Sequence, residues 1–107
     1  MVTELNSSNF DNEIKKGVSI VDMYADWCGP CKRLSPIIED LSKEVKRVKF
    51  VKLNVDDSEE IASRYRIMSI PTIILFKDGS EVGRVIGLLD KEALRNKFKE
   101  ILGKLFV

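Results

Sequence analysis

The 107-residue sequence contains no histidine, and cysteine occurs only twice, as Cys28 and Cys31. Without histidine, the chain cannot build a catalytic triad that uses imidazole as its base, nor a histidine-ligated zinc or haem site. Two cysteines also supply only half of the four ligands that a structural zinc site needs. A metal site would therefore require two further ligands from a partner chain. The two thiols are thus the main candidates for reactive groups in this sequence.

An excess of charge of one sign and long hydrophobic runs are also missing. Lysine and arginine number 18 against 17 aspartate and glutamate residues, and this near balance argues against nucleic acid as a partner. The apolar runs are too short to cross a bilayer, and residues 1–5 lack the basic start and apolar stretch of a signal peptide. We therefore expect no membrane association, a cytoplasmic location and a monomer.

Hydrophobic residues make up 44% of the chain, which is enough for one core, and we expect a single domain over residues 1–107. The apolar period switches between two and roughly 3.6 residues, which is typical of alternating strands and helices. This pattern predicts strands at residues 3–6, 18–25, 48–55, 72–76 and 81–86, with a hairpin turn at Asp78-Gly79. Together with four helices they give the order β-α-β-α-β-α-β-β-α. The predicted fold class is α/β, with a mixed central sheet flanked by the helices.

Capping residues predict where several helices begin. Ser7 or Ser8 can cap a short first helix, and Asp57 with Glu60 three residues later suggests a capping box for the third. Asp90 can cap the final helix. The apolar face of that final helix is expected to contain Leu94, Phe98, Ile101, Leu102 and Leu105.

The segment Cys28-Gly29-Pro30-Cys31 lies between a predicted strand and a long amphipathic helix. A thiol at a helix N-terminus has a lowered pKa, because the free N–H groups and the helix dipole favour the thiolate. The second thiol lies about one turn further on, within reach of a mixed disulfide formed by the first. Gly29 allows a partner to approach the backbone, and Pro30 costs no hydrogen bond in a first turn. We predict that Cys28 attacks and Cys31 resolves, although two ordinary buried cysteines would show the same spacing.

Two further residues near the cysteines stand out. Trp27 precedes the pair and is either part of the core or a partly exposed platform for a substrate; its place at the mouth of a turn favours the platform. Asp22 interrupts a strand that is otherwise apolar on both faces. It lies either at a sheet edge, with its carboxylate in water, or in the interior, where burial would raise its pKa.

The hexapeptide from Trp27 to Lys32 resembles the active-site signature of the thioredoxin family. Similarity to that family extends over essentially the whole chain: residues 21–25 before the site, 52–56 at the end of the next strand, the loop at 69–72, the hairpin at 76–79 and Gly87. The resemblance implies the thioredoxin fold, with a mixed sheet of about five strands. Tyr24 stands where some family members carry a second tryptophan, and we expect it to have no part in the chemistry.

The resemblance also implies roles for particular residues. It implies a cis Ile70–Pro71 bond packed against the dithiol, whereas the local sequence alone favours the commoner trans proline at a strand start. Asp22 would lie behind Cys31 and accept its proton. Lys52 either pairs with Asp22 and tunes it or is a solvated strand residue. The implied groove for an extended peptide substrate consists of Trp27, Gly29, Pro30, Ile70, Pro71 and Gly87.

The implied activity is the reduction of disulfides in protein substrates through the Cys28–Cys31 dithiol, which a separate thioredoxin reductase then restores. No nucleotide-binding Gly-rich loop is present, so we expect no nicotinamide or other cofactor in this chain. Gly29-Pro30 between the cysteines, in place of a histidine, favours a reductant over an oxidase or isomerase. A binding or scaffold module with a dispensable dithiol is the alternative from another functional class.

Overall fold

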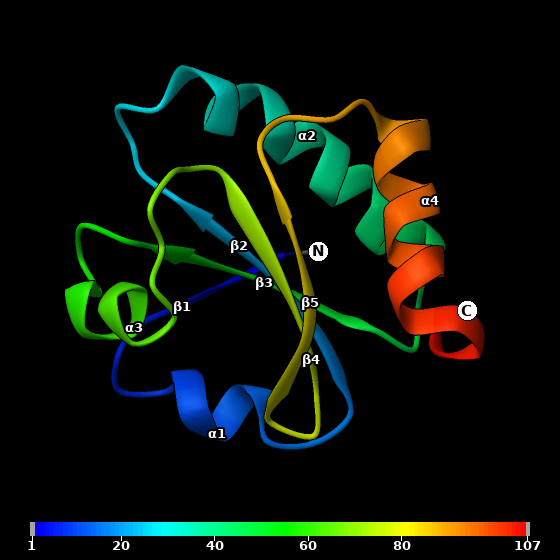
Figure 1. The fold of residues 1–107 in the computed structure, drawn as a ribbon, viewed down its shortest axis with the longest axis horizontal. Coiled ribbons are helices and arrows are strands. Elements are labelled where there is room, and N and C mark those ends of the chain that lie inside the picture. The colour runs from blue at the N-terminus through cyan, green and yellow to red at the C-terminus, as the bar shows by residue number, and fades with distance from the viewer. Residues whose placement is uncertain (1, 107) are drawn as a thin grey trace.

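The computed structural model describes residues 2–106. Five strands form one sheet in the order β1-β3-β2-β4-β5 (Figure 1). The strands are β1 Thr3–Leu5, β2 Val18–Tyr24, β3 Lys49–Asn54, β4 Thr72–Lys77 and β5 Ser80–Ile86. β1, β3 and β2 run parallel, whereas β4 is antiparallel to β2 and β5 is antiparallel to β4. The mixed sheet and the order of the elements confirm the predicted fold class.

Helices cover both faces of this sheet. They are α1 Phe10–Ile14, α2 Gly29–Glu44, α3 Glu59–Arg64 and α4 Lys91–Leu102, followed by a 3-10 turn at Gly103–Leu105. Figure 1 shows α2 and α4 together on one side of the sheet and α1 and α3 on the other. β2, which begins close to α1 and ends just before α2, is the central strand and is covered on both faces.

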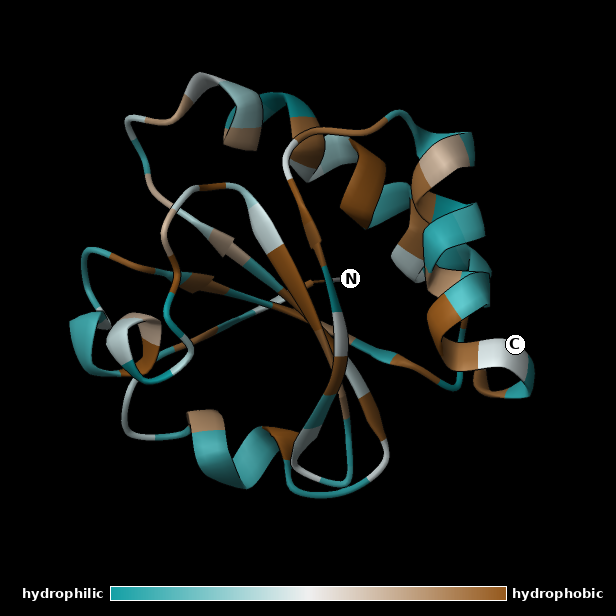
Figure 2. Ribbon diagram, viewed as in Figure 1, coloured by the Kyte–Doolittle hydropathy of each residue, from teal (hydrophilic) through white to brown (hydrophobic). Residues whose placement is uncertain are grey.

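Alternate residues of the central strands enter two separate hydrophobic cores, because successive side chains of a strand point to opposite faces. Ile73 and Leu75 of β4 join the core under α2 and α4. Ile74 and Phe76 join the core under α1 and α3, with Phe10 in contact with Phe76. Apolar residues accordingly run along the central strands in Figure 2, whereas the helices alternate between apolar and polar residues. Strands that are buried on both faces explain why the sequence of β2 is almost continuously apolar.

Two of the three predicted helix caps are wrong. α1 begins after Asn9 and α3 begins after Ser58, and neither residue makes a side-chain cap hydrogen bond. Asparagine side chains fold the preceding turns instead. Asn6 Oδ1 accepts hydrogen bonds from the backbone N–H groups of Ser8 and Asn9, and Asn54 Oδ1 accepts from those of the two aspartates that follow Val55. Such asparagine turns compete with serine and aspartate caps for the same backbone donors.

The cap at Asp90 is confirmed, since its Oδ1 accepts a hydrogen bond of 2.8 Å from the N–H of Ala93. Leu105, in contrast, is not part of the buried face of the last helix: α4 ends at Leu102, and Leu105 is 39% exposed. Gly103 has a φ of +56°, which redirects the chain at this point. Phe106 packs on Phe98 at the end of the core, with ring centroids 5.8 Å apart.

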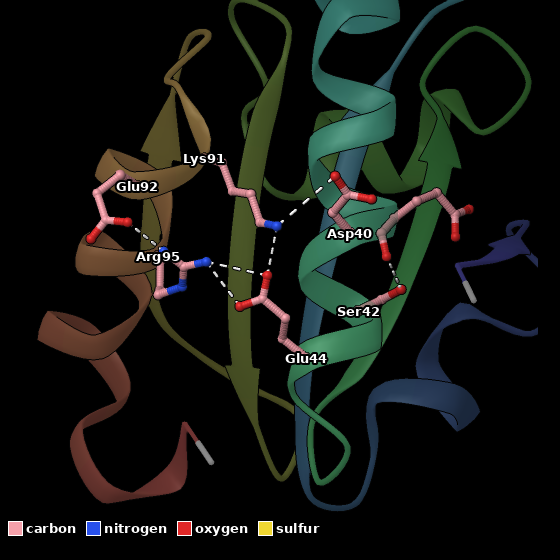
Figure 3. A network of polar contacts seen from close by, with 7 residues as sticks. Asp40, Ser42, Glu44, Lys91, Glu92 and Arg95 are labelled. Carbon is pink, nitrogen blue, oxygen red and sulfur yellow. Dashed lines mark hydrogen bonds and ion pairs between the residues drawn. The ribbon is translucent and has the colours of Figure 1, made fainter.

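An ion-pair network on the surface joins the end of α2 to the start of α4 (Figure 3). Glu44 accepts from Lys91 at 2.7 Å and from Arg95 at 2.8 Å, and these two hydrogen bonds lower the pKa of the Glu44 carboxyl. Asp40 and Glu92 extend the network on either side. All these side chains contact solvent, so each ion pair of the network should contribute little to the stability of the fold.

Gly83 of β5 lies directly under Ile101 of α4. A Cβ atom at Gly83 would lie 2.9 Å from Ile101 Cγ2 and 3.1 Å from its Cδ1, closer than packed side chains tolerate. We therefore expect Gly83→Ala to lower the free energy of unfolding by about 1–3 kcal/mol, the usual cost of overpacking. Urea denaturation measures this cost. In an Ile101→Ala background the cost should largely disappear, and an equal cost in both backgrounds would show that the two residues are not coupled.

Candidate active site

Cys28 and Cys31 form a disulfide at the start of α2, with their Cα atoms 5.3 Å apart. Cys28 is the N-cap residue of the helix, in an extended backbone conformation, and its Sγ accepts a hydrogen bond of 3.2 Å from the N–H of Cys31. Gly29 and Pro30 occupy the first turn between them. In the reduced protein this N–H and the positive end of the helix dipole favour a thiolate at Cys28. The geometry thus provides one activated sulfur with a second sulfur in bonding range.

Both cysteines are buried, in a small cluster at the end of the sheet with Ala25. Tyr24, Val55 and Ile70 pack against this cluster. Cys28 Sγ lies 3.9 Å from the backbone carbonyl oxygen of Ile70. The backbone of Ile70 therefore lies directly beside the sulfur of Cys28.

The Ile70–Pro71 peptide bond is cis, as the family resemblance implies and contrary to the local expectation of a trans proline. The Pro71 carbonyl accepts a hydrogen bond of 2.9 Å from the N–H of Gly87, and Thr72 Oγ1 donates to the Ser69 carbonyl at 2.6 Å. Gly87 has a φ of +94°, which favours glycine, and a Cβ there would meet open space. The structure thereby brings the loop at the start of β4 and the end of β5 to the dithiol.

Trp27 is 71% exposed, which agrees with a platform and contradicts a core position. Its Nε1 donates a hydrogen bond of 2.8 Å to Asp56 Oδ2, which fixes the indole against the turn after β3. Beside the ring lies an open groove of about 680 Å³, lined by Trp27 and Ile70 from the predicted docking set. Gly29, Pro30, Pro71 and Gly87 are not part of its wall, so their contacts with a substrate stay predictions.

The rest of this groove comes from residues that sequence reasoning did not select. α3 and the loop after it contribute Ala62, Arg66, Ile67 and Met68, of which Met68 is 92% exposed. Arg66 adopts a φ of +53°, unusual for a residue with a side chain. An exposed methionine just before the Ile-Pro pair is the one sequence signal that could have indicated an apolar contact surface here.

Asp22 lies in the central strand and is only 4% exposed, so the reading that placed its carboxylate in water is wrong. Burial raises its pKa to about 7, against a smaller lowering effect of the Lys52 charge. Among residues 2–106, Asp22 Oδ1 has no hydrogen-bond partner. A small pocket of about 130 Å³ is lined by both Asp22 and Cys31. The structure therefore brings this carboxyl to the inner side of the dithiol.

Lys52 is the neighbour of Asp22 in the pairing of β2 with β3. Its ammonium group nevertheless forms an ion pair with Glu4, with Lys52 Nζ 4.0 Å from Glu4 Oε1, and one third of its side chain is exposed. Each of the two predictions for Lys52 is therefore correct in part. The side chain is partly solvated, and its charge lowers the pKa of Asp22 although its ion pair is with Glu4.

A disulfide-forming pair at a helix N-terminus, next to a cis-proline loop and an exposed aromatic ring, defines the class of thiol–disulfide oxidoreductases. In the described part of the chain, no group of three or more His, Cys, Asp or Glu residues could hold a metal ion. The same part contains no helix that is both long and apolar enough to cross a membrane.

Comparison with known proteins identifies the family. The family model for thioredoxin matches residues 1–100. Thioredoxin of Chlamydia pneumoniae is 51% identical over 96 residues, covering 90% of this chain and 94% of the relative. Thioredoxin of Staphylococcus saprophyticus is 43% identical over 94 residues, covering 87% and 90%. A solved structure of Plasmodium falciparum thioredoxin superposes with a TM-score of 0.87 at 35% identity, covering 92% of this chain and 98% of the other. The chain belongs to the thioredoxin family and is a thiol–disulfide oxidoreductase with the thioredoxin fold.

Proposed function

We propose that the chain reduces disulfides in protein substrates and that Cys28 and Cys31 have different roles. The Cys28 thiolate attacks one sulfur of the substrate disulfide, forming a mixed disulfide and releasing the other substrate sulfur as a thiolate. Cys31 then loses its proton, attacks Cys28 Sγ and releases the second substrate sulfur. Two electrons pass to the substrate, and the Cys28–Cys31 disulfide is the oxidised product. The observation that carries this order is the N–H of Cys31, which points at Cys28 Sγ.

Docking is the second part of the proposal. The Ile70 backbone, next to Cys28 Sγ, can pair with an extended substrate segment in the manner of strand addition. The groove beside Trp27 offers apolar contact to substrate side chains. We assign Gly29, Pro30, Pro71 and Gly87 to the same docking surface on the strength of the family resemblance. Substrates are therefore disulfide-bonded segments that can extend across this surface.

Asp22 is the proposed acceptor of the Cys31 proton. Its pKa of about 7 lies close to neutral pH, which suits a group that must take and then release a proton. Asp22 and Cys31 line the same small pocket, which is wide enough for water to connect them. Lys52 tunes this carboxyl, because its positive charge lowers the pKa of Asp22.

The oxidised chain needs an external source of electrons, which we assign to a thioredoxin reductase, and we place the protein in the cytosol. The test of the reductant role is the reduction potential of the Cys28–Cys31 pair in defined thiol–disulfide buffers. A value near the thioredoxin magnitude of about −270 mV is the expected result. A value near that of strong oxidases, about −120 mV, would contradict the proposal. Turnover of a protein disulfide with reductase and its electron donor then tests the partner.

A further inference from the structure

Three charged side chains form a row across neighbouring strands. Glu4 of β1 is paired with Lys52 of β3, and Lys52 is paired with Asp22 of β2. Paired residues on adjacent strands point to the same face and lie about 5 Å apart along the row. One lysine therefore stands between two carboxyl groups, of which Asp22 is buried and Glu4 is exposed to solvent.

Lys52 forms its ion pair with Glu4 of β1, and its ammonium group also lies near the Tyr24 ring of β2. Its Nζ lies 4.0 Å from Glu4 Oε1 and 5.7 Å from the centroid of the Tyr24 ring. The Tyr24 hydroxyl donates a hydrogen bond to the same oxygen of Glu4. Burial and this hydrogen bond raise the pKa of Tyr24, so its hydroxyl remains a donor. Glu4 thus holds Lys52 on one side and is itself held by Tyr24.

We propose that Glu4 is a positioning residue that holds Lys52 away from Asp22, and so preserves the ability of Asp22 to accept a proton. This inference rests on the role of Asp22 in the proposed function. If Lys52 paired directly with Asp22, it would stabilise the carboxylate and make it a weaker base. In the structure Lys52 forms its ion pair with Glu4, and Asp22 Oδ1 has no hydrogen-bond partner within residues 2–106.

Other charged and titratable side chains also lie near Asp22, but none of them is paired on neighbouring strands with two carboxylates as Lys52 is. The pocket that contains Asp22 is also lined by Asp26, which follows β2, and by Lys32 of α2, and these two side chains have opposite charges. Cys31 adds a negative charge only when it loses its proton. The titratable and charged groups facing Asp22 are Glu4, Tyr24, Asp26, Cys31, Lys32 and Lys52. Within this set only Lys52 is paired on its neighbouring strands with two carboxylates, Glu4 and Asp22.

The test is the titration of the Asp22 carboxyl, followed by ¹³C NMR in the reduced full-length protein. In Glu4→Gln the lysine has no competing carboxylate in the row, and we expect the pKa of Asp22 to fall by roughly half a unit. Glu13→Gln is the matched control, because Glu13 forms a similar exposed ion pair with Lys49 of the same strand, at 3.7 Å. An unchanged or raised pKa in Glu4→Gln, or an equal shift in the control, overturns the proposal.

A second comparison separates positioning from a direct effect of charge. Lys52→Met should raise the pKa of Asp22, and adding Glu4→Gln to that variant should shift it by less than half of the shift seen with Lys52 present. A full shift without Lys52 would mean that Glu4 acts on Asp22 directly, which overturns the positioning role. Reduction of a protein disulfide by the wild-type chain is measured in parallel. Failure there overturns the proposed function, whereas normal reduction with an unchanged titration overturns this inference alone.

Discussion

Replacing Cys28 with serine is expected to abolish disulfide reduction, with a loss on the order of a thousandfold or more. A serine hydroxyl at the N-cap of α2 is not ionised near neutral pH and cannot form the mixed disulfide. Its small size and its preference for N-cap positions should leave the fold intact. Turnover of a protein disulfide measures the loss, and thermal unfolding confirms that the variant is folded.

Replacing Cys31 with serine should give a different defect. Cys28 can still attack, but no second sulfur releases the substrate, so one substrate chain per protein should accumulate as a covalent adduct. Mass spectrometry after a thiol-blocking step identifies both the adduct and the cysteine that carries it. Cys28→Ser is the matched control and should form little adduct. Faster adduct formation at Cys31 in that control than at Cys28 in Cys31→Ser would reverse the assigned roles.

Elements with a strong apolar period could be predicted well from the sequence. β2 and β4 are covered on both faces, so their continuous apolar runs leave few other interpretations. The dithiol could be predicted for a different reason: a strand, a Cys-x-x-Cys segment and a helix follow one another along the chain. Both kinds of signal are local, and a local signal can be read from a single sequence.

Features that depend on contacts between distant segments could not be predicted in this way. The partner of the Trp27 indole is Asp56, from the turn after β3, and the groove wall comes from α3 and its following loop. Glu4 meets Lys52 only because β1 joins the far edge of β3, which places it beside the chemistry although it stands near the N-terminus. The sequence pattern does not predict the contact of Trp27 with Asp56 or that of Glu4 with Lys52, because both depend on the order of the strands in the sheet.

Errors at the helix starts have a local cause. Ser8 and Asp57 are good cap residues, but asparagines at positions 6 and 54 accept hydrogen bonds from backbone N–H groups of the same turns. Several residue types can satisfy the same donors, and the sequence does not show which one succeeds. Asp90 faces no such competitor in its turn, and its cap was predicted correctly.

Asp22 should make the stability of the protein strongly dependent on pH. Its pKa is about 7 in the folded chain and about 4 when unfolded, so between these values the folded state holds a proton that the unfolded state has released. The free energy of unfolding therefore falls as the pH rises from about 4 to 7, and this group alone contributes about 4 kcal/mol to the fall. Above pH 7 the full cost of the buried charge is present.

Asp22→Asn removes this titration while it keeps the shape of the side chain. The quantity to follow is the free energy of unfolding of the variant minus that of the wild type. This difference should increase by about 4 kcal/mol between pH 4 and pH 8, as measured by urea denaturation at each pH. Comparing the two proteins cancels the titration of every other group. If the free energies of unfolding of variant and wild type changed in parallel with pH, ionisation of Asp22 would cost no stability in the folded protein, and the prediction would be wrong.

The same substitution should slow the release of substrate from Cys28. Without a carboxyl to take the Cys31 proton, we expect the resolving step to be about a hundredfold slower at pH 7, a typical loss for a general base. The rate of mixed-disulfide decay measures this step, and the defect should diminish as the pH approaches the pKa of the thiol, because Cys31 then ionises without help. If Asp22→Asn stabilised the protein and left the rate of mixed-disulfide decay unchanged, Asp22 would destabilise the fold without taking part in the reaction. A stabilised protein that resolves slowly would show that the fold retains a costly buried carboxyl because the exchange reaction uses its proton affinity.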